Sequence, residues 1–126
     1  TTGAFRTPKN IVLSVVLAIG SFAAATAQAH AKIEAAEPKP NSELMTVPKE
    51  ISLHFNEKLE PAFSKIEVFD AKNVALKLPK AAVDKQDQKT MSTQLPLLQS
   101  GQYLVRWSTM THDGHKAKGD FRFRVK

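Results

Sequence analysis

The strongest constraint on the fold is the alternation of apolar and polar residues in several short segments. Near the end of the chain Phe121, Phe123 and Val125 alternate with three basic residues, which places the apolar side chains on one face of an extended strand. Residues 51–57 repeat this period of two with isoleucine, leucine and phenylalanine. A helix would need an apolar stripe at intervals of three and four, and none occurs beyond the first 29 residues. The chain is therefore expected to be all-β.

Turn-forming residues divide the rest of the chain into further short strands. Prolines with asparagine and serine indicate a turn at 38–42, residues 96–101 form another, and 80–89 is a polar loop with at most one helical turn. The sequence predicts strands at 31–37, 51–57, 63–70, 74–78, 90–95 and 102–108, the last of these ending near Met110, and a final strand that starts near Ala117. This spacing favours one antiparallel β-sandwich or small barrel.

The leading stretch has the pattern of a secretory signal peptide. Arg6 and Lys9 form a short basic region, residues 11–25 are almost entirely apolar, and Ala27 and Ala29 have the small side chains of a cleavage site. The apolar run is shorter than the ~20 residues that span a bilayer. We therefore expect residues 1–29 to be removed during export, with no membrane anchor left behind.

Cleavage after Ala29 would give His30 a free α-amine. Residues 30–126, which number 97, would form the single domain. The amine and the ring Nδ1 of His30 could then chelate one metal ion together, which no internal histidine can do. Because the ion must displace the proton of the amine, affinity should weaken as the pH falls.

Composition excludes several classes of function. The chain has no cysteine, which rules out disulfides, blue-copper centres, iron–sulfur clusters with thiolate ligands and zinc sites built from cysteine. The net charge is +6 for the whole sequence, and +4 for residues 30–126 because the leader carries two basic and no acidic residues. The basic residues are scattered among acidic ones, so we do not expect nucleic-acid binding.

A second group of possible metal ligands lies in the polar connection between the last two strands. In extended backbone Asp113 and His115 can point to the same side, Gly114 lets the chain turn, and His112 points away. With an amine, this carboxylate and imidazole would suit Cu(II), and would also accept zinc or nickel. By itself the tripeptide Asp-Gly-His is more typical of a hairpin turn beside a solvated histidine than of a metal site.

Five segments, together with His30 after the signal junction, resemble the CopC-type periplasmic copper-binding proteins, and the Asp-Gly-His-Lys sequence resembles their YobA-like branch. The segments are 38–42, 53–57, 101–107, 113–116 and 121–125. The resemblance implies a Greek-key antiparallel β-sandwich of the Ig-like or cupredoxin-like kind. It also implies a Cu(II) site made by His30, Asp113 and His115, with Glu57 as a weak ligand or a residue just behind the ligands.

The remaining candidate residues are expected to have structural roles. Family members with a Cu(I) site carry a methionine-dense loop, whereas the methionines here are far apart, at Met45, Met91 and Met110. They are expected to pack as core or surface residues. His54 should lie on the outer face of its strand, His112 should be solvated, and Trp107 should belong to the core.

The resemblance implies a non-enzymatic periplasmic monomer that captures and buffers Cu(II) for copper homeostasis and resistance, and passes it to a membrane partner such as a CopD-like protein. Two alternatives remain open. One is a small copper-dependent oxidase or monooxygenase that uses the same amino-terminal histidine. The other is a metal-free exported sandwich for protein contact.

Overall fold

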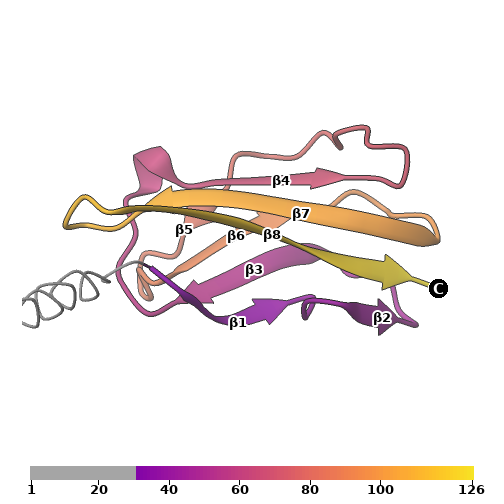
Figure 1. The fold of residues 1–126 in the computed structure, drawn as a ribbon, viewed down its shortest axis with the longest axis horizontal. Helices are drawn as coiled ribbons and strands as arrows, with labels where there is room; N and C mark the ends of the chain where they lie inside the picture. The colour runs from indigo at the N-terminus through magenta and orange to yellow at the C-terminus, as the bar shows by residue number, and fades with distance from the viewer. Residues whose placement is uncertain (1–30) are drawn as a thin grey trace, which may run out of the picture.

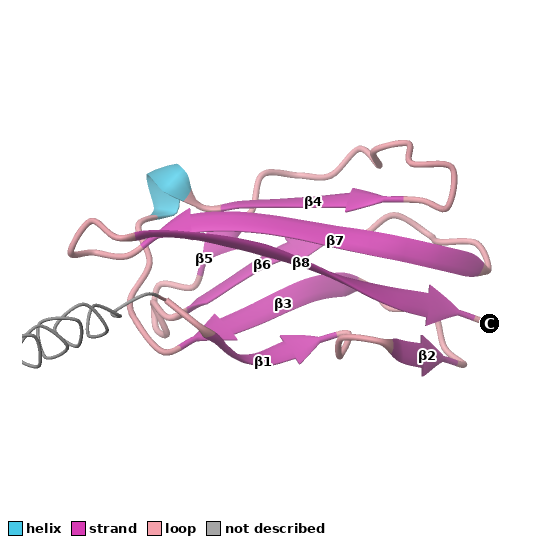
Figure 2. Cartoon of the chain, in the orientation of Figure 1, coloured by secondary structure: helices cyan, strands magenta, loops and turns pink. Residues whose placement is uncertain are grey.

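The computed structural model of the chain describes residues 31–126 as a sandwich of two four-stranded sheets (Figures 1 and 2). The predicted signal peptide, its cleavage site and His30 lie outside these residues. The first sheet has the order β1 (Ile33–Glu37), β3 (Glu50–Phe55), β6 (Thr90–Gln94) and β5 (Ala82–Val83). The second has the order β2 (Ser42–Leu44), β8 (Lys116–Val125), β7 (Gly101–Met110) and β4 (Lys65–Phe69).

The strand pairings agree with the predicted Greek-key antiparallel β-sandwich, with one addition. Every ladder is antiparallel except that of β2 with β8, which is parallel. β1 and β2, although consecutive in the chain, belong to different sheets. Within residues 31–126, the structure contains no helix long and apolar enough to cross a membrane.

The core lies between the sheets and is made by the alternating apolar residues. Ile51, Leu53 and Phe55 of β3 are fully buried, as the period of two predicted. Trp107 of β7, also buried, meets Phe55 edge to face with ring centroids 5.0 Å apart, and this contact joins the two sheets. Burial of each large apolar side chain contributes roughly 1.5 to 3 kcal/mol.

The predicted strand 63–70 begins two residues late. β4 starts at Lys65, whereas Phe63 ends the short 3-10 helix η3 (Pro61–Phe63) and is 56% exposed. Pro61 favours the first turn of a helix, and the hydroxyl of Ser64 donates to the carbonyl of Glu60 at 2.9 Å. These local bonds stabilise a turn where the apolar pattern had predicted a strand.

The prediction of a strand at 74–78 is wrong. The carboxylate of Asp70 accepts hydrogen bonds from the backbone N–H groups of Lys72 and Val74, and Asn73 adopts a φ of 65°. The chain therefore turns sharply, and the following residues make one isolated bridge, between Phe69 and Ala75.

Two very short strands were not predicted. β2 has three residues and lies just after the predicted turn, and β5 has two within the predicted polar loop, where no helical turn forms. Strands this short carry too few residues to show a period, so their existence depends on the neighbouring strands β8 and β6.

Candidate metal centre

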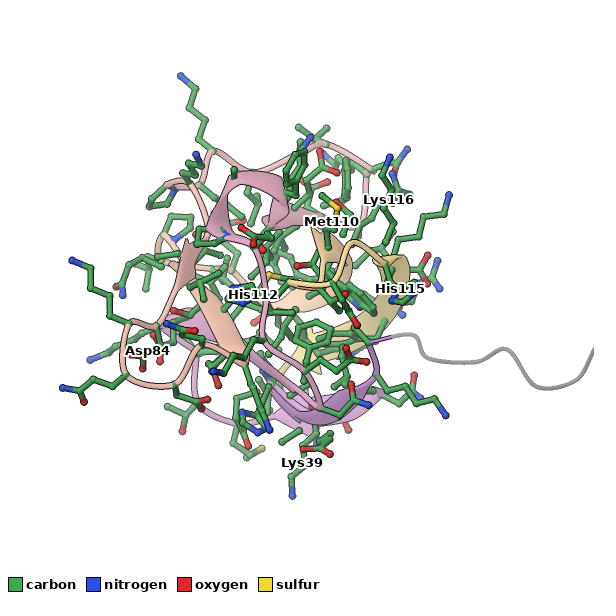
Figure 3. The ribbon with its side chains drawn as sticks, turned by 90° about the vertical axis from the view of Figure 1, so that its left-hand side faces the viewer. Lys39, Asp84, Met110, His112, His115 and Lys116 are labelled. Carbon is green, nitrogen blue, oxygen red and sulfur yellow. The ribbon has the colours of Figure 1, made fainter. Side chains whose placement is uncertain are left out.

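The candidate site occupies the loop 111–115, which joins the two longest strands. β7 and β8 are paired over ten residues, from Gly101 with Val125 to Met110 with Lys116. Their loop projects from one end of the sandwich, where β1 also begins (Figure 1). Figure 3 looks onto this end and labels both loop histidines.

Thr111 organises the backbone of the loop. It is 1% exposed, and its amide N–H donates to the carbonyl of His115 at 2.9 Å. Its hydroxyl donates to Oδ1 of Asp113 and accepts a hydrogen bond from the N–H of His115 at 3.1 Å. The N–H of Gly114 donates to the Thr111 carbonyl at 2.9 Å, with the Gly114 φ at +90°, where glycine is favoured. One buried side chain thus fixes both potential ligand residues.

The structure brings Asp113 and His115 together, as the spacing predicted. Oδ1 of Asp113 lies 3.5 Å from Nδ1 of His115, and the two side chains are 61% and 48% exposed. The Thr111 hydrogen bond, then a backbone hydrogen bond within the loop and the charge of His115, hold the pKa of the Asp113 carboxyl below its usual value, against a smaller opposing effect of desolvation. Asp113 is therefore a carboxylate near neutral pH, the form that binds metal ions.

His112 points away from this pair, also as predicted. Its Nε2 lies 3.7 Å from Oε1 of Glu60, and its backbone N–H donates to the carbonyl of Lys58 at 3.1 Å. The side chain is 46% exposed. Nothing in the sequence predicted that His112 would lie beside Glu60.

The segment that follows β3 connects the start of β1 to the loop. The side chain of Asn56 accepts from the N–H of Lys32 at 2.8 Å, and its own N–H donates to the Lys32 carbonyl at 3.1 Å. Three residues later Leu59 forms a bridge with Thr111. Glu57 is half-buried between these two anchor points.

Sequence reasoning missed Thr111 and Asn56. Thr111 left a weak signal, because threonine side chains commonly bond to nearby backbone groups in turns, as this one does to the N–H of His115. Asn56 left none, since its partner Lys32 is 24 residues away in the sequence.

Within residues 31–126 no group of three or more histidine, aspartate and glutamate side chains could hold a metal ion. Asp113 and His115 therefore need a further ligand to complete a site. The predicted one is His30, and the described residues begin immediately after it, with the buried Ala31.

The methionines occupy separate parts of the fold. Met91 is fully buried in β6, Met110 is half-buried at the end of β7, and Met45 is 79% exposed in the loop after β2. These positions agree with the predicted packing roles.

Comparison with known proteins gives matches over nearly all of the chain. Protein YobA of Escherichia coli K12 is 31% identical over 121 residues, which cover 95% of this chain and 98% of that protein. Copper resistance protein C of Xanthomonas campestris pv. juglandis is 32% identical over 124 residues, covering 94% and 97%. The crystal structure of CopC from Methylosinus trichosporium OB3b superposes with a TM-score of 0.73 at 26% identity, covering 77% of this chain and 94% of that one. The family model of the CopC domain matches residues 33–126, and the chain therefore belongs to the CopC family.

Proposed function

We propose that this protein binds one Cu(II) ion in the periplasm and carries or buffers it for copper homeostasis and resistance. The ligands are the α-amine and ring Nδ1 of His30, the carboxylate of Asp113 and the imidazole of His115. Glu57 acts beside them as a weak ligand or as a hydrogen-bond partner of bound water. The relative named Copper resistance protein C supports copper as the metal.

The observation that carries this proposal is the Asp113–His115 pair. Thr111 fixes both residues, and the pair lies at the end of the sandwich where β1 begins, three residues after His30 in the sequence (Figure 1). Nitrogen and carboxylate oxygen ligands suit Cu(II), whereas Cu(I) prefers sulfur.

The exposure of the two loop ligands suits a carrier. The side chains of Asp113 and His115 are 61% and 48% exposed, so an incoming protein could replace them one at a time without opening the fold. A membrane partner such as a CopD-like copper transporter is the proposed recipient, and the carrier itself acts as a monomer without a membrane anchor.

The proposal is tested by titrating Cu(II) into two preparations, one starting at His30 and one with a single extra residue before it. We expect tight one-to-one binding with a nitrogen-rich electron paramagnetic resonance spectrum only in the first, since a peptide nitrogen cannot replace the amine. Equal affinity and equal spectra in both preparations would remove the amine of His30 from the site.

The same copper-loaded preparation separates a carrier from an oxidase. With ascorbate, oxygen and a polysaccharide, we expect no product beyond that made by the same concentration of free copper. Turnover above that level would contradict the carrier function and favour the monooxygenase alternative.

Export is tested on the full-length precursor. We expect the mature protein recovered from the periplasm to have the mass of residues 30–126, because the protease should cut after Ala29. A mature chain that starts at any other residue would disagree with the proposed amine ligand even if export occurs.

A further inference from the structure

A second set of polar side chains lies on the outer face of the first sheet, away from the loop 111–115. His54 alternates with the buried Leu53 and Phe55, so its ring projects outward from β3. Glu34 of β1 lies on one side of the ring, and Thr90 with Asp87 lies on the other. The metal centre proposed above uses none of these four residues.

A bulge in β1 places Glu34 beside His54. Ile33 pairs with Phe55 and Ala35 pairs with His54, so Glu34 is the extra residue between two consecutive partners. Bulges of this kind redirect a side chain and are common next to binding sites. Here Oε1 of Glu34 lies 3.6 Å from Nε2 of His54.

The hydrogen bonds on the other side of the ring determine its tautomer. The single hydroxyl proton of Thr90 is donated to Oδ2 of Asp87 at 2.8 Å. Thr90 Oγ1, 2.7 Å from Nδ1 of His54, can then only accept, and the nearby Oδ2 of Asp87, at 3.2 Å, is also an acceptor. Nδ1 therefore carries the proton.

Asp87 is ionised in this arrangement. The hydrogen bond from Thr90, then one from the backbone of Lys89 and the charge of His54, hold the pKa of the Asp87 carboxyl below its usual value. A carboxylate that accepts from the Nδ1–H of a histidine orients the ring and strengthens Nε2 as a ligand.

Two lone pairs consequently face each other across the cluster. With one proton on Nδ1, an imidazole ring has a lone pair on Nε2, and the Glu34 carboxylate beside it can only accept. The space between the two atoms can be occupied by a proton on Nε2 or by a metal ion that replaces this proton. Two ligands about 2.0 to 2.1 Å from a tetrahedral ion lie about 3.4 Å apart, close to the separation found here.

From this geometry we infer that Nε2 of His54 and the carboxylate of Glu34 bind a second divalent transition-metal ion, with Asp87 and Thr90 holding the ring. Imidazole with one carboxylate suits zinc, nickel and Cu(II). The side chains are 36% and 56% exposed, and water fills the remaining coordination positions. With two protein ligands instead of three, this site is weaker than the proposed copper centre and exchanges its ion readily.

The test uses Zn²⁺, which is diamagnetic, and the mature chain labelled with ¹⁵N at histidine. Long-range ¹H–¹⁵N spectra report each ring nitrogen separately, so binding at His54 is distinguished from binding at His30 or His115. Without metal at pH 7.5 we expect the Nδ1–H tautomer of His54. On addition of Zn²⁺ beyond one equivalent we expect a saturable shift of His54 Nε2.

Surface variants separate ligation from general charge attraction. Glu34→Gln should weaken the response of His54 by about tenfold or more, and Asp87→Asn by about tenfold, the usual loss when an orienting partner is removed. Glu43→Gln is the matched control, because Glu43 is also an exposed strand glutamate but pairs with Arg124 and Lys126. It should leave the His54 response unchanged, and thermal melts check that each variant is folded.

Three results would each overturn the inference. They are an Nε2–H tautomer in the metal-free protein, a His54 ring that does not respond to millimolar Zn²⁺, and equal affinity in the Glu34→Gln and Glu43→Gln variants. None of them bears on His30, so the proposed copper function stands or fails separately.

Discussion

Thr111 shows how one buried hydroxyl can prepare a solvent-exposed site. The loop that it holds carries two polar side chains within 3.5 Å of each other, and both remain open to solvent. Exposed ion pairs contribute little to folding stability, so the proximity of these two side chains does not itself stabilise the fold appreciably. The buried Thr111 hydroxyl holds the two residues in place through hydrogen bonds to Asp113 and His115.

Replacement of the two loop ligands should selectively weaken copper binding. We expect His115→Ala and Asp113→Asn each to lower Cu(II) affinity by about tenfold or more, equivalent to about 1.4 kcal/mol. His112→Ala is the control, because this ring comes from the same loop but lies beside Glu60. Isothermal titration with a competing chelator measures all three. A loss in His112→Ala as large as that in His115→Ala would count against the assigned ligands.

The supporting role of Thr111 can be separated from the ligands themselves. Thr111→Val keeps the shape of the side chain but removes the bonds to Asp113 and His115, and we expect a loss of about tenfold to 100-fold in Cu(II) affinity. Thr109→Val is matched to it, since Thr109 is also buried in the hairpin but bonds to Ser64 at 2.8 Å. When the Cu(II) affinity is expressed per folded molecule, Thr109→Val should keep the affinity of the unsubstituted protein.

The low pKa of Asp113 predicts a specific dependence on pH. A carboxyl group whose pKa is lower in the folded state stabilises the fold above its unfolded value, ~3.9, and this contribution disappears as the pH falls through the folded value. In the metal-free protein, Asp113→Asn should therefore flatten the acid side of the plot of melting temperature against pH below about pH 4. The carboxyl ¹³C shift of Asp113 should titrate below the usual range, and in Thr111→Val its midpoint should rise. An unchanged midpoint in that variant would refute the assigned cause.

At the scale of elements, the β7–β8 hairpin connects the core to the loop. Trp107 packs on Phe55 of the first sheet and also covers Gly119, its partner across the hairpin. A Cβ atom on Gly119 would lie 2.8 Å from Cζ2 of this indole ring. The close approach of ring and backbone therefore requires glycine at this position.

Gly119→Ala should destabilise the sandwich. The indole must move to admit the methyl group, and overpacking of this kind costs about 1 to 3 kcal/mol. We expect a lower midpoint in chemical denaturation and a shifted Trp107 fluorescence spectrum. Lys118→Ala, at the exposed neighbouring position, should change neither, and a Gly119→Ala midpoint equal to that of the unsubstituted protein would show that the ring moves freely.

The sequence predicted those elements whose alternation is long enough to identify a buried face. The strands containing Ile51 and Phe123 were found because each has a continuous period of two over a core face. The strand predicted around Val74 does not form, because the hydrogen bonds of Asp70 turn the chain at that point. The pairing of β2 with β8 was not predictable, since it joins residues about 80 positions apart and needs only three of them.

For the candidate site, the sequence predicted the proximity of Asp113 and His115 and the separation of His112 from them. The prediction assumed extended backbone, whereas residues 112–114 form a turn, in which the Thr111 hydrogen bonds and the positive φ of Gly114 set the positions of the two residues. The sequence could not predict the bond of Asn56 to Lys32, because the two residues are far apart in the chain. Nor could it predict the contacts of Thr90 and Asp87 with His54, which depend on the pairing of β3 with β6. The role of His30 remains a prediction, as it lies outside the described residues.

At the scale of the whole molecule, the mature chain proposed above would have 97 residues and no cysteine, and it should respond strongly to its ligand. Binding to the folded state alone contributes about 2.7 kcal/mol when free Cu(II) is 100 times the Kd. For a domain of this size the melting temperature should rise by about 10 to 20 °C. Scanning calorimetry of the chain that starts at His30 measures the rise, and the chain with one extra residue is the control. Equal shifts in both would indicate that copper binds elsewhere.

The two ends of the sandwich differ in what can be attached to them. The loop 111–115 and the start of β1 lie at one end, whereas Lys126 lies at the other, where its backbone N–H donates to Leu44 at 2.9 Å (Figure 1). A dye, affinity tag or electrode linker fused after Lys126 would stay a full sheet length from the metal. The same fusion before residue 30 would abolish the proposed chelate, so an immobilised copper sensor built from this scaffold must be tethered by its last strand.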